Sequence, residues 1–356
     1  MKSTKDPPKP YKITLSLLLV IILGVVFYLI KNGNHNDVTD IVNKTSSKLT
    51  NTEIPAQFED LTIPYLRNRT YKSSLGSLDK IDENASYTSY LTNYISDGLK
   101  INGLLTIPTG TVPKGGFPAI VFVHGYIPPQ EYNTMQRYVD YVDYLARNGF
   151  VVFKIDLRGN GNSQGQASGA YFSSGYVIDT LNAYAALQNA SFVNSKEIGL
   201  WGHSMAGNVV LRAMTVEPTI PATVIWAGAV YTYIDQREFG IHDPSYQTPR
   251  VTGAQRINRE SIFQIVGTPS AQSKFWHEVA PTTYLNDLKG AIQIDHALDD
   301  NVVSIKYSEE LNALLNKTDV PHEFYTYPTG GHNISGPSFD LAMQRTVQFF
   351  KKYLDK

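Results

Sequence analysis

The chain has 356 residues, no cysteine and a formal net charge of −1, with 42% hydrophobic and 18% charged residues. This length and hydrophobic content allow one large or two smaller globular domains with a sizeable core. The near-neutral charge argues against a nucleic-acid partner, and the absence of cysteine excludes disulfides, thiolate metal sites and cysteine nucleophiles.

The first predicted element is a membrane span at residues 13–30, ITLSLLLVIILGVVFYLI, which contain no charged side chain. At about 1.5 Å per residue this run can cross roughly 27 Å, close to the hydrocarbon thickness of a bilayer. Four lysines precede it, which places residues 1–12 in the cytoplasm as a tail and the rest of the chain on the extracytoplasmic side. A cleaved signal peptide is the alternative, but no A-x-A-like site follows the run. We therefore expect an uncleaved, single-pass anchor.

Residues 31–58 are rich in Asn, Thr, Ser and Lys and predict a linker. Residues 59–356 then form the predicted domain. Its first regular elements are SYTSYLTNYIS and LKINGLLTIP, two alternating runs separated by Asp97-Gly98, the signal of a β-hairpin. From FPAIVFVHG onward, apolar strand runs alternate with helical patterns, and the last helix is SFDLAMQRTVQFFKKYL.

Strands that alternate with helices predict an α/β fold with a mostly parallel, doubly wound sheet. One interval interrupts this alternation, because residues 232–288 contain polar and aromatic sequence between two predicted strands. An insertion of this length predicts a small helical cap over the carboxyl edge of the sheet.

Ser204 lies where the strand EIGLW meets the helix MAGNVVLRAM. A nucleophilic serine at such a turn needs small neighbours two residues before and after it, and here these are Gly202 and Ala206, followed by Gly207. Ala206 replaces the glycine of the usual G-x-S-x-G pattern. A serine that only caps the helix is the structural alternative.

A serine hydroxyl needs a base to take its proton, and we expect this base to be His332. It lies in the glycine-rich segment YPTGGHN directly after the last predicted strand, HEFYTYP. An exposed loop histidine is the alternative interpretation. The remaining histidines are less suitable, since His203 adjoins the serine and should point away from it, and the others lie at a strand start or in the expected cap, acid and oxyanion segments.

The base needs a carboxylate to orient it, and IQIDHALDDNVVS supplies two acids just beyond a strand. We favour Asp299 for this role, with Asp300 and Asp235 as alternatives. The order Ser, Asp, His along the chain matches that of the α/β-hydrolase arrangement.

The oxyanion of an acyl-transfer reaction needs backbone donors that are already in place. Met205 N–H opens the helix after the serine, where the helix dipole also favours negative charge. The loop HGYIPP follows the strand AIVFV, and we expect its Tyr126 N–H to be the second donor.

The chain resembles the α/β-hydrolases, and in detail the catalytic domain of the prolyl oligopeptidase family of serine peptidases. The resemblance covers about residues 86–356 and is carried, in this order, by FVHGY, DLRGNGNSQG, VNSKEIGLWGHSMAG, HALDDNV and GGHN. It implies a triad of Ser204, Asp299 and His332 that hydrolyses a peptide or ester bond, with Asp156, Arg158 and Gly159 as scaffold. The amino-terminal part is too short for the β-propeller that many of these peptidases carry.

The expected function is therefore peptide-bond hydrolysis by a membrane-anchored serine hydrolase through an acyl-enzyme. A carboxylesterase with the same machinery is one alternative, and a catalytically inactive hydrolase fold that serves as a binding module is another. The sequence predicts no cofactor and no metal, since it has neither an H-x-x-x-H pair nor a phosphate-binding glycine loop. It gives no indication of the oligomeric state.

Overall fold

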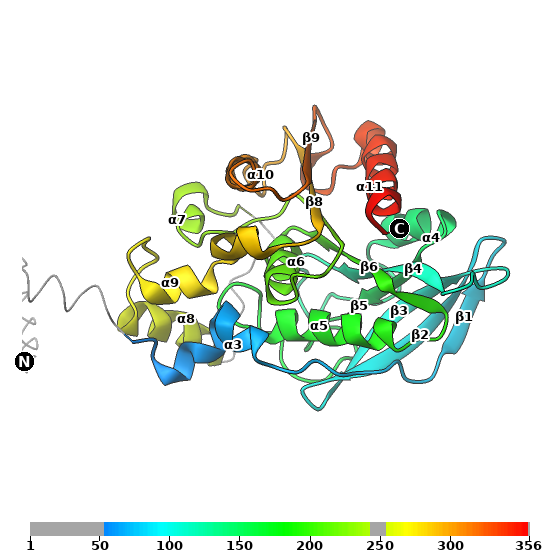
Figure 1. Cartoon of the computed structure of the whole chain (residues 1–356), viewed down its shortest axis with the longest axis horizontal. Coiled ribbons are helices and arrows are strands. Elements are labelled where there is room, and N and C mark those ends of the chain that lie inside the picture. The colour runs from blue at the N-terminus through cyan, green and yellow to red at the C-terminus, as the bar shows by residue number, and fades with distance from the viewer. Residues whose placement is uncertain (1–52, 243–253, 355–356) are drawn as a thin grey trace, which may run out of the picture. The chain divides into compact units, whose positions relative to one another are not determined.

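A mixed β-sheet is the framework of the folded chain in the computed structural model, which describes residues 53–242 and 254–354 (Figure 1). Within these residues the sheet has nine strands in the order β1-β2-β3-β5-β4-β6-β7-β8-β9. The strands are β1 (Asp79–Glu83), β2 (Tyr87–Ser96), β3 (Leu99–Pro108), β4 (Phe117–Val123), β5 (Val151–Ile155), β6 (Val193–His203), β7 (Ala222–Trp226), β8 (Ala291–Ala297) and β9 (His322–Tyr327).

The predicted hairpin is β2 and β3, which pair antiparallel in continuous register from Tyr87↔Pro108 to Ser96↔Leu99. Asp97 and Gly98 join them with φ values of 51° and 78°. Two consecutive positive φ values define the tight turn that suits the twist of a hairpin. β1 was not predicted; it is an edge strand of five exposed residues, DKIDE, whose charges disfavour pairing with another chain.

The sheet is parallel from β5 to β9, and helices cover both of its faces (Figure 1). Helices α5 (Gly175–Gln188) and α6 (Met205–Val216) lie on one face. Helices α4 (Val139–Arg147) and α11 (Phe339–Leu354) lie on the other. The predicted α/β architecture with a mostly parallel, doubly wound sheet is confirmed.

Strand β4 shows why its sequence is continuously apolar. Val121 and Val123 pack into the core on the side of α5 and α6, whereas Ile120 and Phe122 pack on the side of α4 and α11. Because successive side chains of a strand point to opposite faces, a strand covered on both sides needs an apolar residue at every position.

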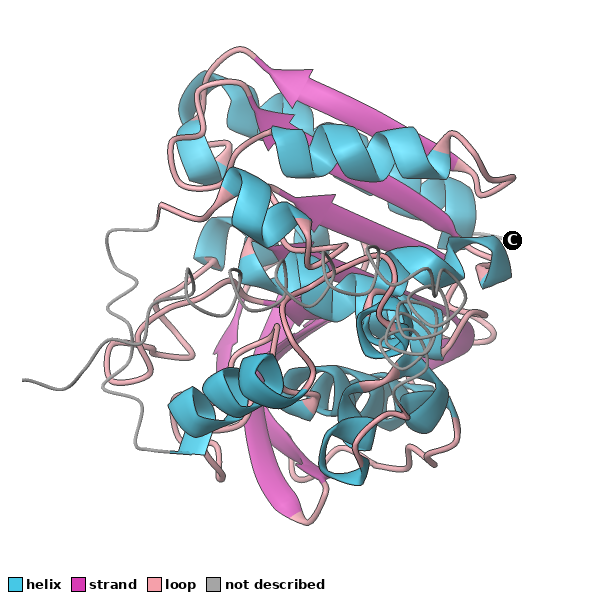
Figure 2. Cartoon of the chain, turned by 90° about the vertical axis from the view of Figure 1, so that its left-hand side faces the viewer, coloured by secondary structure: helices cyan, strands magenta, loops and turns pink. Residues whose placement is uncertain are grey.

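The carboxyl ends of the parallel strands form one edge of the sheet, as the arrowheads in Figure 2 show. β4 and β6 are neighbours, with Val123 opposite Gly202. The segments that follow these two strands therefore begin side by side, although they are far apart in sequence.

Helices also occupy the interval 232–288, in which the cap was expected, although residues 243–253 lie outside the described part of the chain. They are α7 (Asp235–Phe239), α8 (Ala254–Ile265), α9 (Lys274–Val279) and the 3-10 helix η2 (Pro281–Asp287). The remaining helices of the described chain after β8 are α10 (Lys306–Leu315), η3 (Gly331–Asn333) and η4 (Gly336–Ser338).

Two short helices precede the sheet, η1 (Ala56–Leu61) and α3 (Ile63–Arg67), so the compact unit starts at Ile54, slightly before the predicted boundary at 59. Arg212 of α6 holds this segment in place. Its guanidinium is fully buried and donates to the carbonyl oxygens of Leu61, Ala170 and Ser173 and to Ser174 Oγ.

The predicted anchor at residues 13–30 and most of the predicted linker lie outside the described residues. In the part of the chain that is described, none of the helices combines the length and apolar character needed to cross a bilayer.

Candidate active site

Ser204 occupies a one-residue turn between β6 and α6, because the strand ends at His203 and the helix begins at Met205. Its backbone has φ 57° and ψ −122°, a region that residues other than glycine rarely adopt. Strain of this kind costs on the order of 1–3 kcal/mol and concentrates at functional sites. The turn has the strand–serine–helix geometry of a nucleophile.

The neighbours of Ser204 are small because the turn is crowded. A Cβ on Gly202 would lie 2.7 Å from the Ala206 carbonyl oxygen and 2.8 Å from a Val210 methyl group. Only glycine fits there. Ala206 is fully buried, so the turn accommodates the methyl group by which this sequence departs from G-x-S-x-G. A Cβ on Gly207 would meet the Cα of Gly228 at 2.7 Å.

His332 reaches Ser204 from the loop after β9, with its Nε2 2.8 Å from Ser204 Oγ. The loop bends sharply at Gly330 and Gly331, whose φ values are 134° and 57°. The structure therefore brings together the serine and the histidine that the sequence proposed. This separation is within hydrogen-bond reach, as transfer of the hydroxyl proton requires.

The carboxylate beside His332 belongs to Asp300, which corrects the prediction of Asp299. Asp300 Oδ2 lies 2.8 Å from His332 Nδ1, and the Asp300 side chain is fully buried. Its Oδ1 accepts the backbone N–H groups of Val302 at 2.8 Å and Val303 at 3.0 Å. These two bonds form an Asx turn that directs Oδ2 toward the imidazole.

Asp299 holds the backbone of the histidine loop instead of its ring. Its carboxylate oxygens accept the N–H groups of Gly331 at 2.8 Å and Gly330 at 3.3 Å. The two acids are adjacent but their side chains have different partners, since Asp300 is directed by its Asx turn and Asp299 by the glycine N–H groups.

A second imidazole contacts the same carboxylate oxygen. His296, fully buried at the end of β8, places its Nε2 3.1 Å from Asp300 Oδ2 and 3.0 Å from the Val303 carbonyl oxygen. Its Nδ1 lies 2.7 Å from Ser308 Oγ. All three contacts are hydrogen bonds if Nε2 donates to both oxygen atoms and Nδ1 accepts from the serine hydroxyl.

Burial alone raises the pKa of Asp300, but the hydrogen bonds from His296 and His332 outweigh it and hold the pKa well below its usual range. Asp300 is therefore ionised over the whole physiological range. An ionised acceptor at Nδ1 fixes the tautomer of His332 that leaves Nε2 free to accept the serine proton.

The two predicted oxyanion residues lie at the same edge of the sheet. Val123 of β4 pairs with Gly202 of β6. Tyr126 comes three residues after Val123, and Met205 comes three residues after Gly202. Met205 is the first residue of α6, and N–H groups at a helix start have no partner within the helix. Tyr126 packs against the core beside them.

Two other aspartates considered in the sequence, Asp156 and Asp235, make hydrogen bonds that support the fold. Asp156 accepts hydrogen bonds from Tyr132 Oη at 2.8 Å and Thr134 Oγ1 at 2.6 Å, which fixes the loop after β4. Asp235, an alternative for the orienting acid, accepts the N–H groups of Tyr231 and Thr232 in its own turn.

Arg158 forms a charge-assisted pair with the buried Asp179, in which the arginine Nη2 lies 2.7 Å from the aspartate Oδ1. Like Asp156, this residue of the DLRG segment belongs to the scaffold of the domain, as predicted.

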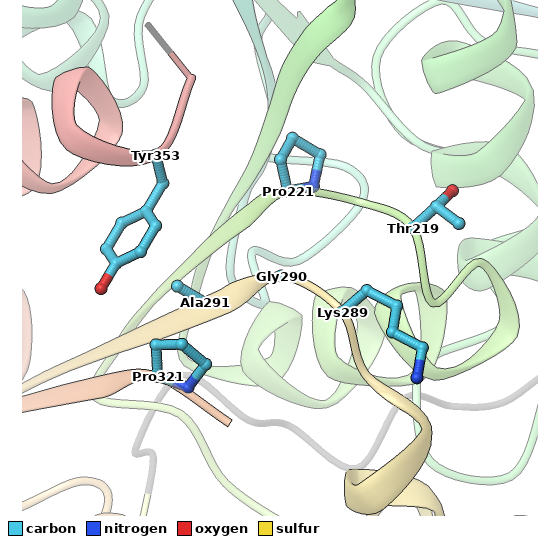
Figure 3. Close-up of a pocket in the computed structure, with 7 residues that line it drawn as sticks. All are labelled: Thr219, Pro221, Lys289, Gly290, Ala291, Pro321 and Tyr353. Carbon is cyan, nitrogen blue, oxygen red and sulfur yellow. The ribbon is translucent and has the colours of Figure 1, made fainter. Parts of the chain in front are cut away.

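Figure 3 shows a small hollow on another part of the unit, lined among others by Pro221, Gly290 and Pro321. These residues immediately precede β7, β8 and β9. The hollow is therefore at the amino edge of the sheet, opposite Ser204. Across residues 53–242 and 254–354, no group of three or more His, Cys, Asp or Glu side chains is arranged to hold a metal ion.

Comparison with known families agrees with this geometry. Residues 117–244 match the family described as serine aminopeptidase, S33, and residues 181–355 match the acyl-CoA thioester hydrolase C-terminal family that includes BAAT. The chain is 25% identical over 266 residues to the uncharacterized peptidase YtmA of Bacillus subtilis, which covers 74% of this chain and 93% of that protein.

Two solved structures share the fold. Acetyl xylan esterase 1 from Thermoanaerobacterium sp. JW/SL YS485 superposes with a TM-score of 0.58 at 19% identity, over 85% of this chain and 98% of that one. The acylaminoacyl peptidase of Pyrococcus horikoshii gives a TM-score of 0.59 at 19% identity, over 76% of this chain and 42% of that one.

Proposed function

Since this chain belongs to the α/β-hydrolase superfamily and is a serine hydrolase, we propose that it cleaves peptide (amide) bonds with Ser204, His332 and Asp300, in the manner of the prolyl oligopeptidase family. The observation that carries the catalytic assignment is the continuous contact from Ser204 Oγ to His332 Nε2 and from His332 Nδ1 to Asp300 Oδ2, both at 2.8 Å. The resemblance to a peptidase over nearly that protein's whole length favours the amide bond.

In the first half-reaction, Ser204 Oγ attacks the acyl carbon while His332 Nε2 takes the hydroxyl proton. The resulting imidazolium donates from both nitrogens, and Asp300 stabilises its charge at Nδ1. The tetrahedral intermediate then collapses as His332 returns the proton to the leaving amine, which leaves the acyl group on Ser204.

In the second half-reaction, water replaces the amine and His332 acts as the base again. In both halves negative charge develops on the former carbonyl oxygen. We assign its stabilisation to the N–H groups of Met205 and Tyr126, with the amino end of α6 adding favourable charge. Loss of one such donor typically costs 10²–10³ in kcat.

A fluorophosphonate probe tests the nucleophile directly. The full chain in detergent should be labelled, and Ser204→Ala should abolish labelling. Ser195→Ala is a matched control, because this serine lies exposed on the same strand and should leave labelling unchanged. Equal labelling of wild type and Ser204→Ala would refute the assignment.

A carboxylesterase is the second candidate, and one observation favours it. The acetyl xylan esterase structure is covered over 98% of its length, whereas the peptidase structure is covered over 42%. A panel of aminoacyl anilides and p-nitrophenyl esters separates the two functions. Turnover of anilides supports the peptidase, while ester turnover without any amide turnover assigns the enzyme to the esterases.

We further propose that residues 13–30 anchor the enzyme in a membrane, with the catalytic unit on the extracytoplasmic side. The support is the uncharged apolar run and the four lysines before it. The full chain should stay in the membrane pellet after an alkaline carbonate wash, and protease added outside intact cells should reach the catalytic unit. Release of the full chain by carbonate would contradict the anchor.

A further inference from the structure

A chain of three hydrogen bonds connects the segment after β4 to the catalytic histidine. The Gly125 N–H lies 3.0 Å from Tyr138 Oη, which in turn lies 2.8 Å from His203 Nδ1. His203 Nε2 then lies 2.8 Å from the backbone carbonyl oxygen of His332. The three bonds join segments that are far apart in sequence.

The direction of every bond in this chain is determined by its two ends. The His332 carbonyl can only accept, so His203 Nε2 carries a proton, and Gly125 N–H can only donate. Tyr138 Oη therefore accepts from Gly125 and donates its own proton to His203 Nδ1. His203 is 2% exposed, and burial lowers its pKa to about 3, so the ring is neutral as this arrangement requires.

The glycine at position 125 gives independent support for this arrangement, because it leaves room for the Tyr138 and His203 side chains. A Cβ there would lie 2.9 Å from Tyr138 Oη and 3.1 Å from His203 Nδ1. The phenol and the imidazole thus fill the space that a side chain would need. Tyr138 itself has a φ of 58° as it precedes α4, so its backbone adopts an unfavourable conformation that brings the ring into place.

We propose that His203 and Tyr138 are positioning residues that hold the His332 loop and the Gly125 segment in register with the nucleophile; this inference rests on the proposed function. His203 directly precedes Ser204 and donates to the carbonyl of His332 itself. The bond therefore fixes the distance between the two catalytic residues without involving the proton that they exchange. Gly125 directly precedes Tyr126, so the same chain of bonds orients the proposed oxyanion donor.

The need for such a support follows from the loop. His332 comes after Gly330 and Gly331, both in conformations with positive φ, so its local backbone is intrinsically permissive. A misplacement of the base of about 1 Å can cost about 10²-fold in rate. The side chains of His203 and Tyr138 reduce this freedom through their hydrogen bonds.

Tyr138→Phe removes one hydroxyl and tests the proposal. It leaves the Gly125 N–H and His203 Nδ1 without their shared partner, so we expect kcat to fall 10- to 100-fold while KM changes less than threefold. Fluorophosphonate labelling should slow by the same factor as kcat. Tyr94→Phe is the control for loss of a tyrosine hydroxyl elsewhere in the domain, because Tyr94 is buried and its hydroxyl donates to the backbone carbonyl of Asp179 at 2.9 Å.

Two substitutions at His203 separate positioning from packing. Gln can still donate an N–H to the His332 carbonyl, whereas Phe keeps a ring but no donor, so His203→Gln should retain at least tenfold more activity than His203→Phe. Circular dichroism and thermal melting should show that the variants are folded. Tyr138→Phe with wild-type kcat, a loss equal to that of Tyr94→Phe, or equal activity of the two His203 variants would overturn the proposal.

Failure of this inference is distinguishable from failure of the proposed function. If wild type hydrolyses no acyl substrate and takes no probe, the proposed function is wrong. The hydrogen-bond order is tested without turnover by ¹⁵N-histidine NMR of the full chain, with the His203 signals assigned by their loss in His203→Gln. A neutral Nε2–H tautomer near pH 7 is expected, and an Nδ1–H tautomer or a protonated ring would overturn the inference.

Discussion

Replacing each of the two adjacent acids by its amide gives the sharpest test of the site. In Asp300→Asn, the side-chain oxygen must still accept the N–H groups of Val302 and Val303, as Oδ1 does now. The new NH₂ group then replaces Oδ2, which lies 2.8 Å from His332 Nδ1 and 3.1 Å from His296 Nε2. An N–H donor at that position requires His332 Nδ1 to be an acceptor, which moves the ring proton to Nε2.

A histidine protonated at Nε2 cannot take the proton of Ser204. The same change in a Ser-His-Asp triad lowers kcat by about 10⁴, equivalent to about 5.4 kcal/mol at 1.36 kcal/mol per tenfold. Asp299→Asn is different, since an amide oxygen can still accept the Gly331 N–H. Loss of the charge weakens these bonds by about 1 kcal/mol, so we expect at most about a tenfold fall in kcat.

The assay is steady-state hydrolysis of the best acyl substrate, with the concentration of active sites determined by fluorophosphonate titration of the wild type. The two variants should differ in kcat by about 10³-fold, the ratio of the two expected losses. Circular dichroism should show that both are folded. A greater loss in Asp299→Asn than in Asp300→Asn would refute the assignment of Asp300 and restore the acid expected from the sequence.

Three of the four further predictions concern stability, which urea unfolding measures, and the fourth concerns activity, which the hydrolysis assay measures. Burial raises the pKa of Asp295 to about 8. Between about pH 4 and pH 8 the native state therefore keeps a proton that the unfolded state loses, so stability falls as the pH rises through this range. Asp295→Asn should reduce the slope of this pH dependence by one proton. Gly202→Ala forces a methyl group against the Ala206 carbonyl oxygen and should lower the free energy of unfolding by about 1–3 kcal/mol. Ala206→Gly should keep activity within about threefold, since the usual nucleophile turn has glycine at this position. Arg212→Met leaves several buried carbonyl groups without a donor and should cost at least about 3 kcal/mol. An unchanged pH slope, a neutral Gly202→Ala or a neutral Arg212→Met would contradict the corresponding argument.

The sequence predicts the parts of the molecule in which local pattern and fold agree. Ser204 and His332 could be predicted because each lies at a boundary between elements that hydrophobic periodicity already defines. The hairpin at Asp97-Gly98 is predictable for the same reason, since the two residues prefer the positive φ values that the turn needs.

The orienting acid could not be chosen from periodicity. Asp299 and Asp300 are neighbours beyond the same strand, and a shift of one residue reverses the direction of a side chain. The structure separates the two acids by an Asx turn, in which Asp300 Oδ1 accepts the Val302 N–H. The sequence does not separate them, because an aspartate at either position can accept the amides that follow it.

The contacts of His203 could not be predicted from a sequence pattern. Its partner Tyr138 is 65 residues away, and the bond depends on the left-handed backbone of that tyrosine. The helices η1 and α3 were not predicted either, because their short apolar pattern gains its stability from docking onto Arg212 and the core.

The three histidines near Ser204 show how one side-chain type serves separate roles. His203 and His296 are buried, and each directs Nε2 to a backbone carbonyl while its Nδ1 meets a hydroxyl group, that of Tyr138 or Ser308. Both act as fixed N–H donors, one to the loop of the base and one to the turn of the acid. His332 alone among the three contacts the serine with Nε2 and the carboxylate with Nδ1. Because both nitrogens of His203 and of His296 already have hydrogen-bond partners, the proposed mechanism assigns the proton of Ser204 to His332 alone.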